Sequence, residues 1–207
     1  QSVNGILHGY PAGLPTLSSR GNSSEAMAAK SLQRPEYTGG IGLEGVLALR
    51  TFVEQGGTLL AFGEATNLPI DLFPLPVSNT AARGSFKAPG AILRIRVAAG
   101  NLLGAGMPAE ANAFVDGGYA FESRTLKGVR KPEAAVRTVA SYAERDLLAS
   151  GWMSGENIIK GKDAVTEVSL GKGRVVLFGI RPQFRGQTFA TFKLVLNALY
   201  LAAAEKR

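Results

Sequence analysis

The chain has 207 residues, which is enough for one large domain with its own hydrophobic core. Hydrophobic residues make up 45% of it and charged residues 19%, and no stretch is long and apolar enough to span a bilayer. The net charge of +7 comes from scattered Lys and Arg residues, without the basic block or the aromatic-basic ladder that is typical of nucleic-acid binders. We therefore expect neither a membrane span nor a nucleic-acid partner.

Cysteine is absent, and His8 is the only histidine. The missing thiol excludes disulfides, thiolate metal sites and a Cys nucleophile. A catalytic zinc site normally uses two or three His residues with a carboxylate, which one His cannot supply. We therefore expect no metal ion and no cofactor in this chain, and we interpret His8 as a surface or capping residue.

The first 35 residues are rich in Gly, Pro and Ser and predict a loop with at most one short strand, near Ile6 and Leu7. The clearest helix follows in GLEGVLALRTFVEQGG, where apolar residues recur at helical spacing up to Gly56 and Gly57. The next run, TLLAF, is continuously apolar and predicts a buried strand. A helix followed at once by such a strand is half of a βαβ unit.

The middle of the chain predicts short elements. Prolines limit the next segment to a helical turn around Leu68–Leu72. AILRIRVA alternates apolar and basic residues, which is typical of a half-exposed strand or of a sheet edge. Further strands are expected around Ala113–Phe121 and in AVRTVASYA.

The last third predicts a hairpin and a helix. AVTEVSL alternates, GKG turns, and RVVLFGI is apolar throughout. GKG is not a phosphate-binding loop, because a strand and not a helix follows it. The final helix is expected to pack on the sheet through one face, which carries Phe189, Phe192, Leu196, Leu199 and Tyr200.

Several of these segments in order resemble one family. EYTGGIGLEGVLALRTFVEQGGTLLAF, FKAPGAILRIRV, GAGMP, SGWMSGE and GKGRVVLFGIRPQFRGQTFATFKLVLNAL are similar to the C-terminal region of bacterial secreted zinc carboxypeptidase-like proteins. In that family a carboxypeptidase A-type catalytic domain precedes a domain similar to class I glutamine amidotransferases. The resemblance runs from about Arg34 to about Ala202, whereas residues 1–33 match poorly.

The resemblance implies a flavodoxin-like, class I glutamine amidotransferase-like three-layer α/β sandwich with a mainly parallel sheet, to which the β-hairpin is added. We expect a single domain over residues 1–207, in which 1–35 is a loop-rich N-terminal segment and a truncated start. The alternatives are that the chain is a fragment or that it begins partway through the domain. The resemblance also implies an extracytoplasmic location, secreted or periplasmic. Its implied partner is the catalytic carboxypeptidase domain of the same protein, which would hold the zinc.

The turn after TLLAF is the first candidate site. An amidotransferase needs a Cys nucleophile on a sharp strand-to-helix turn, with a His base. Here the turn reads Gly63-Glu64-Ala65-Thr66-Asn67, so the amidotransferase reaction is excluded by the missing thiol. Glu64 remains a candidate for binding a polar ligand or for acting as a base. The alternative is that Glu64 caps the next helix or pairs with an arginine.

The loop between RVVLFGI and the last helix is the second candidate site. Ligands of open α/β sheets bind beyond the carboxyl ends of the strands, and two guanidinium groups can hold a carboxylate there. The candidates on this edge are Arg181, Gln183, Arg185 and Gln187, with Trp152, Glu156 and Arg94 as further lining residues. The alternative is that the arginines link loops through backbone carbonyls and Glu36 or Glu122. Phe184 stands where members of the family tend to have His, which disfavours catalysis by this loop.

Three functions follow from these observations. The favoured one is a non-catalytic accessory domain of a zinc carboxypeptidase-like protein, which binds a peptide or glycan or braces the catalytic domain. The second is a Glu64-dependent hydrolase of an amide or a glycan. The third is an oligomerisation module in which AILRIRV forms an edge or an interface.

Overall fold

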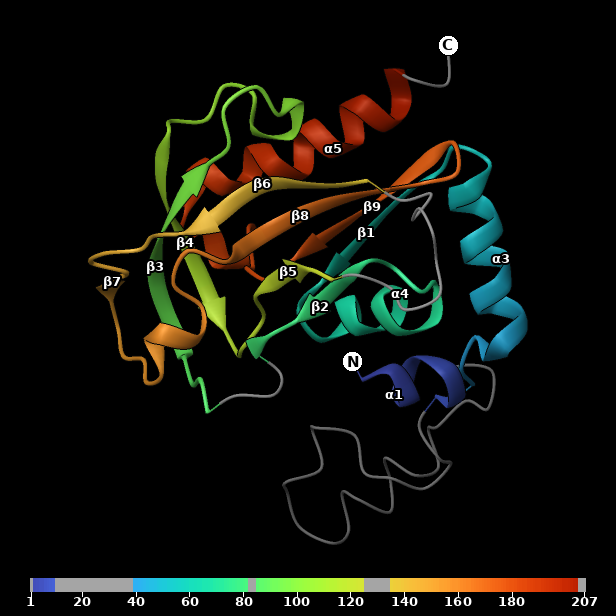
Figure 1. Cartoon of the computed structure of the whole chain (residues 1–207), viewed down its shortest axis with the longest axis horizontal. Helices are drawn as coiled ribbons and strands as arrows, with labels where there is room; N and C mark the ends of the chain where they lie inside the picture. The colour runs from blue at the N-terminus through green and yellow to red at the C-terminus, as the bar shows by residue number, and fades with distance from the viewer. Residues whose placement is uncertain (1, 10–38, 82–84, 125–134, 205–207) are drawn as a thin grey trace, which may run out of the picture. The chain divides into compact units, whose positions relative to one another are not determined.

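The computed structural model describes residues 2–9, 39–81, 85–124 and 135–204 (Figure 1). The chain separates into two compact units, residues 1–49 and 50–207. The first holds helix α1 (Val3–His8) and the start of α3 (Gly42–Glu54), and α3 ends in the second unit. The single domain expected over residues 1–207 stays a prediction. No helix in the described residues is both long and apolar enough to cross a membrane.

The strand predicted near Ile6 and Leu7 is wrong, because these residues belong to α1. Ser2 is the N-cap of this helix, and its side-chain oxygen accepts a hydrogen bond from the Gly5 amide at 3.1 Å. A serine in this position satisfies an amide that the helix itself leaves unpaired, which favours a helical turn over a strand.

In its described residues, the second unit is built on one nine-stranded sheet with the order β1-β9-β8-β6-β3-β4. In addition, β5 pairs with β2 and β8, and β7 pairs with β3. The strands are β1 (Thr58–Phe62), β2 (Val77–Asn79), β3 (Pro89–Val97), β4 (Glu110–Asp116), β5 (Phe121–Ser123), β6 (Val136–Tyr142), β7 (Leu148–Ser150), β8 (Asp163–Leu170) and β9 (Gly173–Phe178).

The prediction of a mainly parallel sheet is not confirmed. Of the strand pairs between described residues, β1–β9 is parallel and the others are antiparallel. Parallel neighbours need a long crossover, usually a helix, whereas the described residues between β2 and β9 form no α-helix. The predicted hairpin is confirmed as β8–β9, which turns at Gly171 and Lys172.

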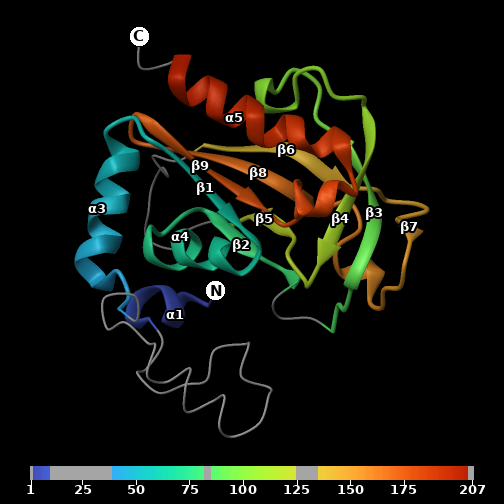
Figure 2. The ribbon, with the colours of Figure 1, turned by 180° about the vertical axis from the view of Figure 1, so that it is seen from behind.

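Two helices lie on opposite sides of the central strands: α5 (Phe192–Ala204) on one side and α4 (Asn67–Leu72) on the other (Figures 1 and 2). Both helices were predicted, but the buried face of α5 was not. Leu194 and Ala198 are its buried residues, whereas Phe189, just before it, and Leu196, Leu199 and Tyr200 on it are 81%, 50%, 56% and 73% exposed. Almost every position of α5 is apolar, so periodicity alone does not select the face.

The strand β3 shows the predicted alternation, since Ala91, Leu93 and Ile95 are buried and Arg94 and Arg96 are exposed. Its assignment as a sheet edge is wrong, because β3 is paired with β4 on one side and with β6 and β7 on the other. The strand β4 follows β3 at the end of the order. The sheet curls there (Figure 1), so that the segment after β9 reaches β4, where the Arg181 amide donates to the Phe114 carbonyl.

Candidate functional site

Four polar side chains gather where β1 and β9 end. We call Glu64, Asp116, Tyr119 and Arg181 the strand-end cluster. Because β1 and β9 are parallel, the turn that carries Glu64 and the loop that carries Arg181 leave the sheet at the same edge. Arg181 Nη2 lies 3.0 Å from Asp116 Oδ2, and the Arg181 amide donates to the Phe114 carbonyl at 2.9 Å. This hydrogen bond joins the β9 end to the strand β4.

The Tyr119 phenol lies between the charged members of the cluster. Burial raises its pKa above the ordinary value of 10.0, the Glu64 carboxylate raises it further, the Arg181 guanidinium lowers it, and Asp116 raises it. The net shift is upward, so the phenol keeps its proton at neutral pH and can donate a hydrogen bond.

The turn after β1 bends at a glycine. Gly63 has a φ of +54°, and Thr66, which is fully buried, donates its hydroxyl to the Gly63 carbonyl at 2.6 Å. In a nucleophile elbow the residue on the strained turn carries the attacking group. Here that residue has no side chain, and the exposed Glu64 follows it. The N-cap of α4 is Thr66, and Glu64 lies in the preceding 3-10 helix, Gly63–Thr66.

The loop after β9 is held by an aromatic ring. Phe184 stacks on Phe114 of β4, with ring centroids 4.5 Å apart. The guanidinium carbons of Arg181 and Arg185 lie over the same Phe184 ring, at 5.5 Å and 5.1 Å from its centroid. Arg185 has a φ of +49°, a left-handed conformation that costs energy in a residue with a Cβ. The backbone at Arg185 is therefore strained.

Buried hydroxyl groups support the same loop from behind. Thr191 is fully buried and donates towards the Pro182 and Thr188 carbonyls, each at 2.7 Å. The buried Tyr142 hydroxyl donates to the carbonyls of Tyr119 at 2.9 Å and Gly179 at 3.4 Å. Side-chain hydrogen bonds therefore fix the segments on either side of the strand-end cluster.

The Tyr119 backbone also approaches the end of β9 closely. A Cβ atom at position 179 would lie 2.5 Å from the Tyr119 carbonyl oxygen and 3.1 Å from that of Ala164. Only glycine fits between two backbones at that distance, which explains the Gly residue directly after β9.

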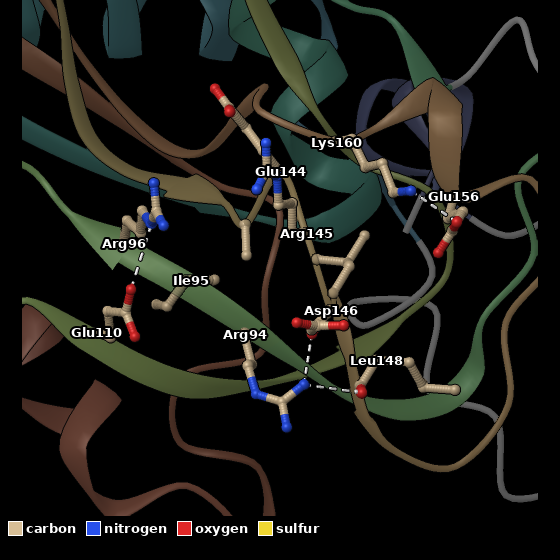
Figure 3. A pocket seen from close by; sticks show the side chains of 12 residues that line it. Arg94, Ile95, Arg96, Glu110, Glu144, Arg145, Asp146, Leu148, Glu156 and Lys160 are labelled. Atoms are coloured by element: carbon tan, nitrogen blue, oxygen red, sulfur yellow. Dashed lines mark hydrogen bonds and ion pairs between the residues drawn. The ribbon is translucent and has the colours of Figure 1, made fainter.

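Arg94 and Glu156 lie elsewhere, in a hollow of about 1140 Å³ between β3 and the segment before β7 (Figure 3). Arg94 donates to the backbone carbonyls of Asp146 and Leu148, the latter at 3.0 Å. Glu156 pairs with Lys160 at 2.6 Å. Charged side chains of both signs thus line this hollow, and Arg94 links β3 to the segment around β7 through backbone carbonyls.

The structure divides the predicted site residues into groups. Glu64 and Arg181 belong to the strand-end cluster, and Gln183, Arg185 and Gln187 are exposed in the loop beside it. Arg94 and Glu156 line the separate hollow, whereas Trp152, 55% exposed, is not among the residues that line that hollow. Of the predicted acidic partners, Glu122 pairs with Lys162 at 2.7 Å, and Glu36 lies outside the described residues.

Sequence reasoning missed Asp116 and Tyr119. The sequence Asp116-Gly117-Gly118-Tyr119 reads as a turn after a strand, and that signal alone does not place it beside the ends of β1 and β9. Within the described residues, no three His, Cys, Asp or Glu side chains are grouped as a metal ion would require. The strand-end cluster therefore offers hydrogen-bond donors, acceptors and both signs of charge.

No protein-family model matches the chain. No curated protein sequence matches it significantly either. Among solved structures it is similar to a β-galactosidase from Bacillus circulans sp. alkalophilus, with a TM-score of 0.47 and 13% identity over 77% of this chain and 21% of that one. It is also similar to a protein described as a GMP synthase subunit from Thermoplasma acidophilum, with a TM-score of 0.49 and 11% identity over 79% of this chain and 67% of that one.

A third similar structure is a ThuA-like protein from Bacteroides uniformis, with a TM-score of 0.44 and 12% identity over 76% of this chain and 63% of that one. The chain thus spans only 21% of the β-galactosidase. Structures similar to this mixed α/β chain thus include a ThuA-like protein and a GMP synthase subunit. With TM-scores below 0.5, no activity or site residue is carried over from them to this chain.

Proposed function

We propose that the chain is a non-catalytic, amidotransferase-like accessory domain of an extracytoplasmic zinc carboxypeptidase-like protein. The ordered sequence resemblance from about Arg34 to about Ala202 supports the choice of parent protein. In this proposal the catalytic domain of the same protein is the partner and holds the zinc. The accessory domain binds a peptide or glycan, or braces its partner.

One observation at the end of β1 carries the non-catalytic part of the proposal. The residue of that turn with a left-handed backbone is Gly63, which has no group that could attack a substrate. The carboxylate of its neighbour Glu64 and the Arg181 guanidinium both act electrostatically on the Tyr119 phenol, which keeps its proton. A nucleophile with an adjacent base is the arrangement that covalent hydrolysis needs. A carboxylate, a phenol and an ion pair are better suited to binding polar groups.

Exposed apolar side chains support the bracing role. Leu196, Leu199 and Tyr200 of α5 are each at least half exposed, and Phe189 just before α5 is 81% exposed. Leu196, Leu199 and Tyr200 share a face of α5 because of their helical spacing, and adjoining exposed apolar side chains mark protein interaction sites more often than isolated ones do. It also favours the third of the functions named above, an oligomerisation module, with α5 as the contact surface in place of β3.

Turnover assays of the whole chain test the non-catalytic proposal. We expect no ammonia from glutamine and no amino acid from peptides with a free C-terminus, with or without added Zn²⁺, while a zinc carboxypeptidase in the same assay serves as positive control. Zinc-dependent release by this chain alone would overturn the proposal. Release that Glu64→Gln abolishes would instead establish the Glu64-dependent hydrolase.

Sedimentation over a wide range of concentrations separates bracing from self-assembly. An accessory domain that braces another domain is expected to sediment as a monomer by itself. Concentration-dependent dimers that Leu199→Glu dissociates, and that the exposed control Lys193→Glu leaves intact, would support the oligomerisation module.

A further inference from the structure

Two adjoining hollows lie on a different part of the sheet from the strand-end cluster. Their volumes are about 580 Å³ and about 190 Å³, and both are lined by Arg137 of β6, Glu167 of β8 and Arg174 of β9. Arg137 and Glu167 are direct cross-strand partners, so their side chains share a face of the sheet. Arg174 is two residues before Val176, the partner of Glu167 on β9, and therefore shares that face too.

A nearly buried ion pair lies between the hollows. Arg174 Nη1 is 2.8 Å from Glu167 Oε1, and the two side chains are only 18% and 10% exposed. The Asn101 amide lies 3.5 Å from the other oxygen, Glu167 Oε2. Burying two charges costs several kcal/mol, and apolar residues of the same size often stabilise a fold as well or better. This pair therefore has a better explanation as the polar wall of a binding site than as a source of stability.

Positive charge exceeds negative charge among the residues that line the hollows. Glu167 is their single carboxylate, and it faces Arg174, the exposed Arg137 and, in the smaller hollow, Lys172. Within the described part of the chain, Arg137 has no ion-pair partner, although it lies opposite Glu167 in the β6–β8 register. A guanidinium in this setting favours an anionic ligand.

The remaining lining of the larger hollow is mainly apolar. Ala98 and Ala99 follow β3, Leu102 of the short helix η4 (Leu102–Gly104) is 65% exposed, and Leu201 of α5 is half-buried. An apolar group placed here would remove these side chains from water, which is favourable by about 25 cal/mol for each Å² covered. The lining thus combines a cationic wall with an apolar wall, in a volume suited to a small ligand.

We propose that this hollow binds a carboxylate that carries a short, branched apolar group. Arg137 holds the carboxylate, Arg174 stays with Glu167, and Leu102 and Leu201 contact the apolar group. A free branched-chain carboxylic acid and the C-terminal residue of a peptide that ends in an apolar side chain share this chemistry. This site is separate from the strand-end cluster and does not depend on which protein is the parent.

Isothermal titration calorimetry of the whole chain with four probes tests the proposal. The probes are 4-methylpentanoate, 4-methylpentanamide, N-acetyl-alanyl-leucine and N-acetyl-alanyl-leucinamide. We expect at least one of the two carboxylates to bind, and each amide to bind about tenfold more weakly or worse, because a charge-assisted hydrogen bond to arginine is lost. Binding of the free acid alone identifies a small-molecule site, and binding of the peptide alone identifies a C-terminus site.

Two variants locate the binding. Arg137→Gln is expected to weaken binding of the carboxylate about tenfold. Arg137→Lys is expected to weaken binding less, because lysine keeps the charge but lacks the planar guanidinium group that can donate two parallel hydrogen bonds. The matched control Arg96→Gln removes an exposed β3 arginine that pairs with Glu110, outside both hollows. The proposal is overturned if neither carboxylate binds at millimolar concentration, if the amides bind equally well, or if Arg137→Gln and Arg96→Gln behave alike.

Discussion

The two ends of β9 carry the same chemistry in different surroundings. Arg174, near its start, pairs with Glu167 at 2.8 Å, and Arg181, after its end, pairs with Asp116 at 3.0 Å. The first pair has side chains that are 18% and 10% exposed, and the second has side chains that are 46% and 42% exposed. An exposed pair contributes about 0.2–1 kcal/mol, whereas breaking a buried pair costs about 3–5 kcal/mol. Burial, and not the distance between the atoms, therefore decides what each pair does.

The comparison also separates structural from binding roles. The exposed pair belongs to the strand-end cluster, where water competes for every charge and a ligand can displace a partner at little cost. The nearly buried pair can hardly rearrange, because each charge would be left in a poorly solvated place. We therefore expect the Arg174–Glu167 pair to be a fixed wall and the exposed cluster to be adaptable.

The largest loss of stability is expected from Glu167→Gln. It leaves the guanidinium of Arg174 in a mostly buried place without its carboxylate, so the free energy of unfolding should fall by about 3 kcal/mol. Equilibrium unfolding in urea measures it. Glu110→Gln, at the exposed pair with Arg96, is the control and should change stability by less than about 1 kcal/mol. Equal losses of unfolding free energy in the two variants would contradict the claim that burial decides what each ion pair contributes.

The next effect is expected from Tyr142→Phe. The Tyr142 hydroxyl is buried and donates to the Tyr119 and Gly179 carbonyls, so its loss should lower the free energy of unfolding by about 1–2 kcal/mol. Tyr200→Phe, at a side chain that is 73% exposed, is the control and should have no measurable effect. A stability of Tyr142→Phe equal to that of the unsubstituted chain would show that the hydroxyl does not hold the strand-end cluster.

A smaller difference in stability is expected from two variants that test the backbone strain at Arg185. Arg185→Ala and Arg185→Gly both remove the guanidinium from the Phe184 ring, but only glycine relieves the left-handed conformation at φ +49°. The Gly variant should therefore be more stable than the Ala variant by about 1 kcal/mol, as measured by thermal unfolding. The opposite order, which is normal where φ is negative, would contradict a strained Arg185.

The smallest expected effect is a pH dependence from Asp163 at the start of β8. Burial raises the pKa of this carboxyl above the ordinary value of 3.8, although the Thr166 hydroxyl, which donates to Asp163 Oδ2 at 2.9 Å, opposes the shift. The folded state therefore binds the proton more tightly than the unfolded state. This contribution to stability is complete below the ordinary pKa and is lost as the pH rises through the folded pKa.

Thermal unfolding of the unsubstituted chain and of Asp163→Asn over a range of pH isolates this contribution. The stability of the unsubstituted chain relative to the variant should fall as the pH rises through that window and then level off. A relative stability that rises with pH would mean that the folded state instead favours the charged carboxylate.

Sequence patterns predicted those strands and turns that are determined by residues close together in the chain. The strand β1 and the hairpin β8–β9 follow from apolar runs and from the turn at Gly171, and the alternation in β3 follows from its own sequence. Strand direction was not predictable in this way, because pairing joins residues far apart in the chain. For example, Phe62 of β1 is the register partner of Phe178 of β9.

The functional residues show the same limit. Glu64 and Arg181 were found because each follows a recognisable strand, whereas Tyr119 joins them only through the curl of the sheet. Glu167 occupies a position where alternation in β8 predicts an exposed polar residue, yet it is 8% exposed. Its burial depends on Arg174 and Asn101, which come from other elements.

Two double-mutant cycles, measured by urea unfolding, test the central claim that burial separates the two ends of β9. One cycle uses Glu167→Ala and Arg174→Ala, and the other uses Asp116→Ala and Arg181→Ala. The claim predicts a coupling energy of about 1 kcal/mol or less for the exposed pair, reduced further by salt, and a coupling at least about twice as large for the buried pair. Equal coupling energies with equal salt dependence would contradict it.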